Sequence, residues 1–332
     1  MTQAPAQSEQ TMTTAKADSQ NAGLAPSAKN ASELPKETLL KWLYDMQLIR
    51  EFENRTMQAY QQAKIGGFCH IYTGQEACAV GTIGCVNSDD PVITAYRDHG
   101  HALARGMTPE ACMAEMFGKV TGCAKGKGGS MHMFDRKNWL FGGHGIVSAQ
   151  TPMGAGFAFA ILENNGYSMG TAINRHTANA ENLTDRAKGY GMLTTKIDGL
   201  DIMNIYNEFR PIVDQCREES RPAFIDLKTY RYQGHSMSDP QKYRTKEEVD
   251  QYKDKDSIAK LVSDLMDKGW LSEGDWKSMQ KDIRDIVRAA IDAAEAAPAP
   301  EDDELFTDVY ANPEKNLSPT ATYSHGTKNP LM

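Results

Sequence analysis

The sequence predicts an α/β fold with a mainly parallel sheet flanked by helices, and three observations support this. Apolar residues recur at three- and four-residue spacings after Pro35, which indicates a long amphipathic helix. Residues 194–199 and 222–230 have strand patterns and enclose a predicted helix at 201–219, which makes a βαβ unit. The apolar stretch at 91–96 predicts one more buried strand. Strands that alternate with helices favour parallel pairing.

Residues that commonly begin helices predict several further helices. Thr108 followed by Pro109 is a cap with proline at the first helical position, which predicts a helix over 109–118. Thr245 and Glu248 have the spacing of a capping box, in which each side chain bonds the other residue's backbone amide. Further helices are expected after Gly74, from about Gln150, over 256–268 and over 273–296.

The bulk composition is typical of a soluble globular protein. Of 332 residues, 40% are hydrophobic and 24% are charged. The formal net charge of -8 indicates no general affinity for nucleic acid. No apolar run approaches the roughly 20 residues that span a membrane. The six cysteines include no CxxC pair, so reduced thiols in a cytoplasmic protein are expected.

Composition also divides the chain. Residues 1–33 contain few large apolar side chains, and a disordered tail is expected there. This stretch resembles neither a secretory signal, which needs an apolar region, nor an arginine-rich mitochondrial presequence. Residues 34–312 are expected to form one domain, and 313–332 a polar C-terminal tail.

Five glycine-flanked motifs contain histidine and lie in segments that are expected to be loops. Their histidines are His70, His99, His101, His132, His144 and His235. Glycine lets a backbone approach a ligand closely, and histidine can transfer protons or bind anions near neutral pH. The motifs together indicate a ligand site, although a single histidine is usually structural. A zinc hydrolase is a weaker interpretation, because HExxH is absent.

Three segments are candidates for binding phosphate. Tyr96-Arg97 follows a predicted strand, where α/β sheets bind ligands, and an arginine can bind a diphosphate through two hydrogen bonds. GHSMSDP at 234–240 also follows a strand, but it has the composition of an ordinary turn. KGKGG at 125–129 lacks the Walker spacing and is equally consistent with a flexible surface loop.

Six segments carry a more specific signal. They are GFCHIYTGQEA, YRDHGHALARGMTPE, FGKVTGCAKGKGGSMHMF, GGHGIVSAQTPMGAG, ENNGYSMGT and TYRYQGHSMSDPQKYRTKEE. In this order they resemble the alpha subunits of the thiamine-diphosphate-dependent 2-oxo acid dehydrogenases, and the pyruvate dehydrogenase class most of all. The resemblance spans residues 36 to 312 and implies a thiamine-diphosphate-binding fold.

The resemblance also implies which residues meet the cofactor. Tyr96 and Arg97 would hold the diphosphate, and His235 would lie beside it at the mouth of the active site. Gly145 and Val147 would meet the aminopyrimidine through their backbones. The catalytic candidates are His235, His99 and His70, of which the last two would line the same pocket.

A magnesium ion is implied beside the diphosphate. The side chain of Asn165 and the carbonyl of Tyr167 would bind it. Met169 would pack near the cofactor or fill the core. Magnesium takes about six oxygen ligands, usually with one or two carboxylates besides the phosphates, and these two protein oxygens are both neutral. An acidic ligand is therefore expected as well.

That acidic ligand is missing from the sequence. In the family, an aspartate within Gly-Asp-Gly precedes the Asn-Asn pair by a strand-helix-strand stretch, but this chain contains no Gly-Asp-Gly. MGAGFAFA runs directly into ILENNG, although a βαβ unit takes about 30 residues or more. We therefore expect a fold without one βαβ unit, from a deletion or a wrongly joined gene near 160–161. Ile161 and Leu162 are expected to remain as part of a strand.

The resemblance implies oxidative decarboxylation of pyruvate, with transfer of the acetyl group to the lipoyl group of a second, acetyltransferase component. A beta subunit would complete an α2β2 heterotetramer. The alternatives are a branched-chain 2-oxo acid or acetoin dehydrogenase, and a truncated paralogue without catalysis. Phosphorylation of Ser236 or Ser238 would add negative charge near the diphosphate and impede its binding.

Overall fold

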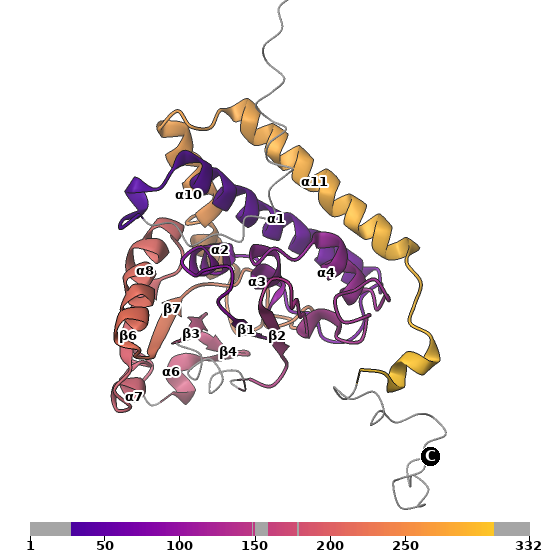
Figure 1. The fold of residues 1–332 in the computed structure, drawn as a ribbon, viewed down its shortest axis with the longest axis horizontal. Coiled ribbons are helices and arrows are strands. Elements are labelled where there is room, and N and C mark those ends of the chain that lie inside the picture. The colour runs from indigo at the N-terminus through magenta and orange to yellow at the C-terminus, as the bar shows by residue number, and fades with distance from the viewer. Residues whose placement is uncertain (1–27, 148, 150–158, 178, 309–332) are drawn as a thin grey trace, which may run out of the picture.

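The computed structural model describes residues 28–147, 149, 159–177 and 179–308 (Figure 1). The helix expected from Gln150, the tail at 313–332 and most of the tail at 1–33 lie outside these residues. Ala31–Glu33, which the sequence assigned to the tail, forms a short 3-10 helix (η2). Its Ala31 amide donates to Asn207 Oδ1 at 2.6 Å, so the folded part begins before residue 34.

Helices and strands alternate along the described chain. The α-helices are α1 (Lys36–Gln61), α2 (Glu76–Ile83), α3 (His99–Ala104), α4 (Pro109–Met116), α6 (Ile173–His176), α7 (Asp185–Lys188), α8 (Ile202–Glu219), α9 (Lys246–Lys253), α10 (Ser257–Asp267) and α11 (Glu273–Ala296). The strands are β1 (Val92–Ala95), β2 (Leu140–His144), β3 (Phe159–Asn164), β4 (Tyr167–Ser168), β5 (Thr171–Ala172), β6 (Leu193–Asp198) and β7 (Ala223–Lys228). Two further 3-10 helices are η3 (Gly129–Met131) and η4 (Asp302–Phe306). In the described residues, no helix is long and apolar enough to cross a membrane.

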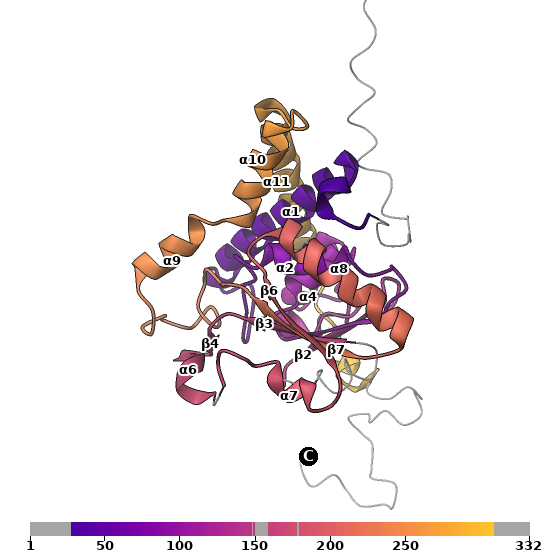
Figure 2. The same cartoon turned by 90° about the vertical axis from the view of Figure 1, so that its left-hand side faces the viewer.

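The core forms around α1. Its predicted apolar stripe is buried at Leu39, Leu43, Met46, Ile49 and Phe52, each with at most 1% exposure. Helix α11 lies along α1 and α4 on one side, and α8 packs against α2 and β6 (Figures 1 and 2). Burial of this stripe, rather than local helix propensity, supplies most of the stability of such a helix.

The strands confirm the α/β prediction with parallel pairing. In one sheet the order is β3-β7-β6, and both pairs are parallel. Strands β6 and β7 enclose α8, which is the βαβ unit predicted from the sequence. Strands β1 and β2 form a separate parallel pair, and β4 and β5 a short antiparallel hairpin. The parallel strands are thus divided between two sheets.

The expected loss of a central strand would divide the sheet in this way. In the described residues, β2 pairs only with β1, and β3 pairs only with β7. Ile161 and Leu162 do remain in a strand, opposite Ile225 and Asp226 of β7. Two strand edges that a continuous sheet would pair are therefore without a strand partner in this part of the chain.

The helix caps match the sequence in part. The Thr108 side chain accepts from the Ala111 amide, as the cap prediction requires. The Thr245 hydroxyl likewise accepts from the Glu248 amide. The Glu248 carboxylate does not complete the capping box, because it binds two tyrosine hydroxyls. That half of the capping-box prediction is wrong.

Candidate cofactor site

The site lies at the carboxyl ends of the parallel strands, where open α/β sheets bind ligands. Strand β1 ends directly before Tyr96, and β2 ends directly before Gly145. Because Ala95 and His144 are partners in the parallel register, Tyr96 and Gly145 emerge side by side. Strand β3 leads into Asn165 in the same way.

Three rings form the centre of the site. The ring of His70 lies 4.5 Å from Tyr96 and 5.1 Å from His235, measured between centroids. Tyr96 and His235 lie 5.5 Å apart. The fold thus brings together Tyr96 and His235, which sequence analysis expected at the diphosphate, and His70, which it expected to line the same pocket, although 165 positions separate the first residue from the last.

Arg97 is buried and connects the two segments that carry the histidines of this cluster. Its guanidinium donates to the carbonyl of Ile71 at 2.6 Å and to the carbonyl of His235 at 2.7 Å. Each carbonyl belongs to a segment that carries one of the histidines. Arg97 therefore fixes the two segments relative to each other. These two hydrogen bonds go to the protein's own backbone and not to a diphosphate.

Both histidines are neutral at pH 7. Burial, and next the charge of Arg97, lower the pKa of His70 to about 3. The same causes lower the pKa of His235 to about 4. The Nδ1 atoms of both rings are buried and have no hydrogen-bond partner among the described residues. Two such atoms beside a buried arginine suit a polar or anionic ligand, because buried polar groups are normally paired.

These pKa values predict a pH dependence of stability. Unfolded histidines take up protons below about pH 6.5, whereas the folded ones stay neutral until about pH 4 and about pH 3. The unfolded state then binds more protons, so the free energy of unfolding should fall as pH drops from 6.5 towards 4. Urea unfolding at pH 7 and pH 5 should show a smaller decrease for the His70→Asn, His235→Asn double variant. Equal decreases would contradict the prediction.

His99 occupies a different environment from the other two catalytic candidates. It is fully buried, and its Nδ1 lies 2.9 Å from Glu53 Oε1 while its Nε2 lies 2.9 Å from Ser130 Oγ. Glu53 Oε1 also accepts from the amide of Tyr72 at 2.9 Å. Burial lowers and Glu53 raises the pKa of His99, and the net change is upwards. With both nitrogens engaged, His99 links α1, the segment after His70 and the glycine-rich loop.

Glu163 connects the Asn-Asn segment (residues 164–172) to Tyr72, which lies two residues after His70, and to His101. The Glu163 carboxylate accepts from the Tyr72 hydroxyl at 2.6 Å and lies 3.1 Å from His101 Nε2. The Oδ1 atom of Asn165 is buried and has no hydrogen-bond donor among the described residues. An unpaired amide oxygen at the proposed metal position suits a cation.

The other predicted residues surround this centre. Val147 is 69% exposed and follows Gly145 just beyond β2. The hydroxyl of Tyr167 donates to Glu248 at 2.8 Å. Met169 is 63% exposed, so it is not core filler in this structure. In the described residues, no three His, Cys, Asp or Glu side chains form a metal-binding group.

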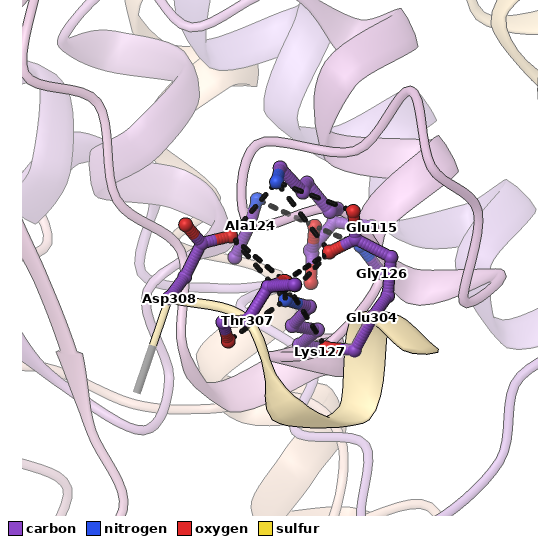
Figure 3. A network of polar contacts seen from close by, with 8 residues as sticks. Glu115, Ala124, Gly126, Lys127, Glu304, Thr307 and Asp308 are labelled. Atoms are coloured by element: carbon purple, nitrogen blue, oxygen red, sulfur yellow. Dashed lines mark hydrogen bonds and ion pairs between the residues drawn. The ribbon is translucent and has the colours of Figure 1, made fainter. Parts of the chain in front are cut away.

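The glycine-rich loop binds a carboxylate of its own chain. Glu115, which is fully buried, accepts four backbone amides, from Ala124 at 2.7 Å, Gly126 at 3.0 Å, Gly128 at 2.6 Å and Gly129 at 3.2 Å. Figure 3 shows Glu115 with Ala124 and Gly126. Gly126 has a φ of +77°, a conformation that side chains rarely adopt. The amides that a phosphate would need are therefore occupied, and the loop is anchored rather than flexible.

The two lysines of this loop face outwards. Lys125 and Lys127 contact Glu304, Thr307 and Asp308 around η4 (Figure 3). The lysines are 48% and 30% exposed, and exposed ion pairs contribute only about 0–1 kcal/mol each. These contacts hold the segment after α11 against the loop but add little stability.

Comparison with known proteins assigns the family. The sequence model of the Dehydrogenase E1 component family matches residues 44–162 and 159–302. The chain belongs to the dehydrogenase E1 component family. This E1 family match confirms the resemblance found in the six sequence segments, and it is interrupted at 159–162, where β3 begins.

Curated relatives of this E1 chain share one name, pyruvate dehydrogenase E1 component subunit alpha. The relative from Rickettsia prowazekii (strain Madrid E) is 39% identical over 315 residues, which cover 83% of this chain and 96% of the relative. The relative from Rhizobium meliloti (strain 1021) is 40% identical over 319 residues, with 84% and 91% covered. The mitochondrial relative from Dictyostelium discoideum is 37% identical over 317 residues, with 83% of each chain covered.

The coverage shows that residues are lacking inside the E1 match. The alignment with the Rickettsia prowazekii relative has 315 positions, whereas 83% of 332 residues is about 276. About 39 aligned positions therefore have no residue of this chain. This length suits one βαβ unit, which takes about 30 residues or more.

Sequence analysis missed three glutamates in and around this E1 site, of which Glu53 and Glu115 are buried. Glu53, Glu115 and Glu163 each connect segments that lie apart in the sequence. A signal did exist for Glu53, which falls within the apolar stripe of α1 four residues after Ile49. A charged residue in such a stripe is almost never buried without a partner.

Proposed function

We propose that this chain is the alpha subunit of a pyruvate dehydrogenase E1 component whose cofactor site is incomplete. The family and the names of the relatives support the general activity, the oxidative decarboxylation of pyruvate. The acetyl group would pass to the lipoyl group of an acetyltransferase component, and a beta subunit would complete an α2β2 assembly. Thiamine diphosphate supplies the carbanion chemistry of such enzymes when it is bound.

The residues fit one half of the cofactor better than the other. At the diphosphate position, the unpaired Nδ1 atoms of His70 and His235 offer polar contacts beside Tyr96. At the magnesium position, Asn165 Oδ1 is unpaired, but an asparagine oxygen and the Tyr167 carbonyl are both neutral. Glu163, the acid closest in sequence, is already bound to Tyr72 and His101.

The proposal rests on the absence of a negatively charged ligand at the magnesium position. Mg²⁺ binds hard oxygen ligands and usually includes one or two carboxylates besides the phosphates. Removing one partner of a buried ion pair costs about 3–5 kcal/mol. Every 1.4 kcal/mol is a factor of ten, so the affinity for magnesium and thiamine diphosphate should fall by about 100-fold to 4,000-fold.

Calorimetry tests this proposal directly. Thiamine diphosphate and Mg²⁺ are titrated into the purified chain mixed with its beta subunit, and an intact alpha subunit such as the Rhizobium meliloti relative is the control. We expect micromolar binding for the control and none in that range for this chain. Micromolar binding by this chain would refute the incomplete site.

The second candidate function is a partner protein without catalysis. Phe134, Trp139 and Phe141 lie before and within β2 and are each 40% exposed or more, and the rings of Trp139 and Phe141 are in contact. Such exposed aromatic side chains are common at protein interfaces. Size-exclusion chromatography would detect a complex with the beta subunit, and assays of pyruvate with an artificial electron acceptor would measure its activity. With thiamine diphosphate and Mg²⁺ raised far enough to offset the weaker binding, an inactive complex favours the partner protein, and an active one favours the enzyme. The same assay with branched-chain 2-oxo acids and acetoin would identify a different substrate.

A further inference from the structure

Glu248 breaks a local rule of its own helix. Its amide is capped by the Thr245 hydroxyl at 3.2 Å, so half of a capping box has formed. Its Oε1 atom accepts instead from the Tyr167 hydroxyl at 2.8 Å and from the Tyr230 hydroxyl at 2.9 Å. Natural sequences depart from local rules mainly at functional sites. The contacts of Glu248 with Tyr167 and Tyr230 are therefore candidates for a functional role.

Through Tyr167, Glu248 is connected to the loop that carries His235. The rings of Tyr167 and Tyr243 are 5.1 Å apart, and the Tyr243 hydroxyl donates to Asp239 Oδ2 at 2.7 Å. The same carboxylate oxygen accepts from the amide of His235 at 2.6 Å. A chain of direct contacts therefore runs from α9, through the Asn-Asn segment, to the ring cluster. We call residues 234–244 the His235 loop.

A second contact joins the same two segments. Arg231 donates to the carbonyl of Met169 at 2.6 Å and to the hydroxyl of Tyr243 at 3.0 Å. Met169 has a φ of +53°, so its peptide is held in a conformation that methionine rarely adopts. The turn of the Asn-Asn segment is thus anchored on one side by Arg231 and on the other by Glu248.

We propose that Glu248 is a positioning residue, which fixes the Asn-Asn segment relative to the His235 loop through the Tyr167 hydroxyl. This inference rests on the proposed function, because it assigns Glu248 to the support of the positions proposed for magnesium at Asn165 and Tyr167. Glu248 touches neither position's ligand atom itself. Since it lies on α9, the ordering of α9 and of the His235 loop is coupled to that of the metal position.

The chemistry of the hydroxyl agrees with this role. The Tyr167 phenol donates a hydrogen bond to the Glu248 carboxylate at 2.8 Å. Hydrogen bonds to charged groups contribute more than neutral ones do. An alanine at 248 would leave two tyrosine hydroxyls without this acceptor.

Amide hydrogen exchange of the cofactor-free chain tests the proposal. Glu248→Ala should raise the exchange rates of residues 164–172 and 234–244 by about tenfold. The matched control is Glu247→Ala, because Glu247 is exposed in the same helical turn and should leave both segments unchanged. Glu248→Gln keeps an oxygen that accepts both hydroxyls, so it should recover rates within about threefold of the unaltered chain. Faster exchange in α9 alone, or equal effects of both alanine variants, would overturn the proposal.

A second measurement separates positioning from a general loss of stability. Tyr167→Phe removes only the hydroxyl, and it should accelerate exchange in 164–172 while leaving β7 unchanged. In protein labelled with 3-fluorotyrosine, the ¹⁹F signal assigned by Tyr167→Phe should move in Glu248→Ala and not in Glu247→Ala. An unmoved signal would overturn the proposal. Because no cofactor is added, this result is independent of the calorimetric test of the incomplete site.

Discussion

Insertion of the absent segment should restore cofactor binding to this chain. The segment comes from the Rickettsia prowazekii relative, in which about 39 aligned positions in total have no counterpart in this chain, and it is placed at the interruption near 159–162. The new strand would pair with the edges of β2 and β3 and join the two parallel sheets. Its Gly-Asp-Gly aspartate would supply the missing carboxylate. We expect affinity for thiamine diphosphate with Mg²⁺ to rise by about 100-fold to 4,000-fold.

The same insertion should stabilise the fold. Each new backbone hydrogen bond contributes about 0.5–1.5 kcal/mol, and each kcal/mol shifts Tm by about 2–4 °C in a domain of this size. A rise in Tm of about 10 °C is therefore expected, measured by circular dichroism. The control carries the same insert with its aspartate changed to alanine. It should gain stability but not micromolar binding, whereas tight binding by the control would show that charge is not the missing element.

Replacement of Glu115 should strongly destabilise the fold. Glu115→Ala leaves four amides of the glycine-rich loop without their acceptor, at a position with no exposure. An unsatisfied buried donor costs about 1–3 kcal/mol, and water will reach part of this loop. We expect a loss of about 4 kcal/mol in the free energy of unfolding, measured in urea.

Two controls make this prediction specific. Glu110→Ala changes an exposed carboxylate on the same helix, α4, and should cost no more than about 1 kcal/mol. Formate is small enough to occupy the space that the Glu115 side chain leaves. Formate at roughly 50–200 mM, a range suited to weak anion binding, should recover part of the lost stability in Glu115→Ala alone. Equal responses of the two variants to formate would contradict the assigned role.

Much of the scaffold was predictable from the sequence because its signals are local. The stripe of α1, the cap at Thr108 and the βαβ unit from β6 to β7 all depend on residues within a few positions of each other. Strand β2 and helix α3 were not predicted, because each is only five or six residues long and contains glycine and histidine. Elements this short show too little periodicity to be recognised, and tertiary contacts decide their conformation.

The candidate site was predictable only as a set of residues. Sequence motifs named His70, Tyr96 and His235, and the structure brings their rings into contact. The same motifs could not show that Arg97 donates to two backbone carbonyls, or that both nitrogens of His99 are engaged. Those details depend on which acceptors the fold brings within hydrogen-bond distance.

The sequence by itself determined the family, the alternation of helices and strands, and the absence of Gly-Asp-Gly from the chain. Only the tertiary structure decided which partners three glutamate side chains find. Glu53, Glu163 and Glu248 find partners 46, 91 and 81 positions away. Helical periodicity and capping act within one or two turns, so they carry no information about such pairs. A buried carboxylate must be paired wherever the folded chain offers a donor, and that choice is made by the packing of the whole domain.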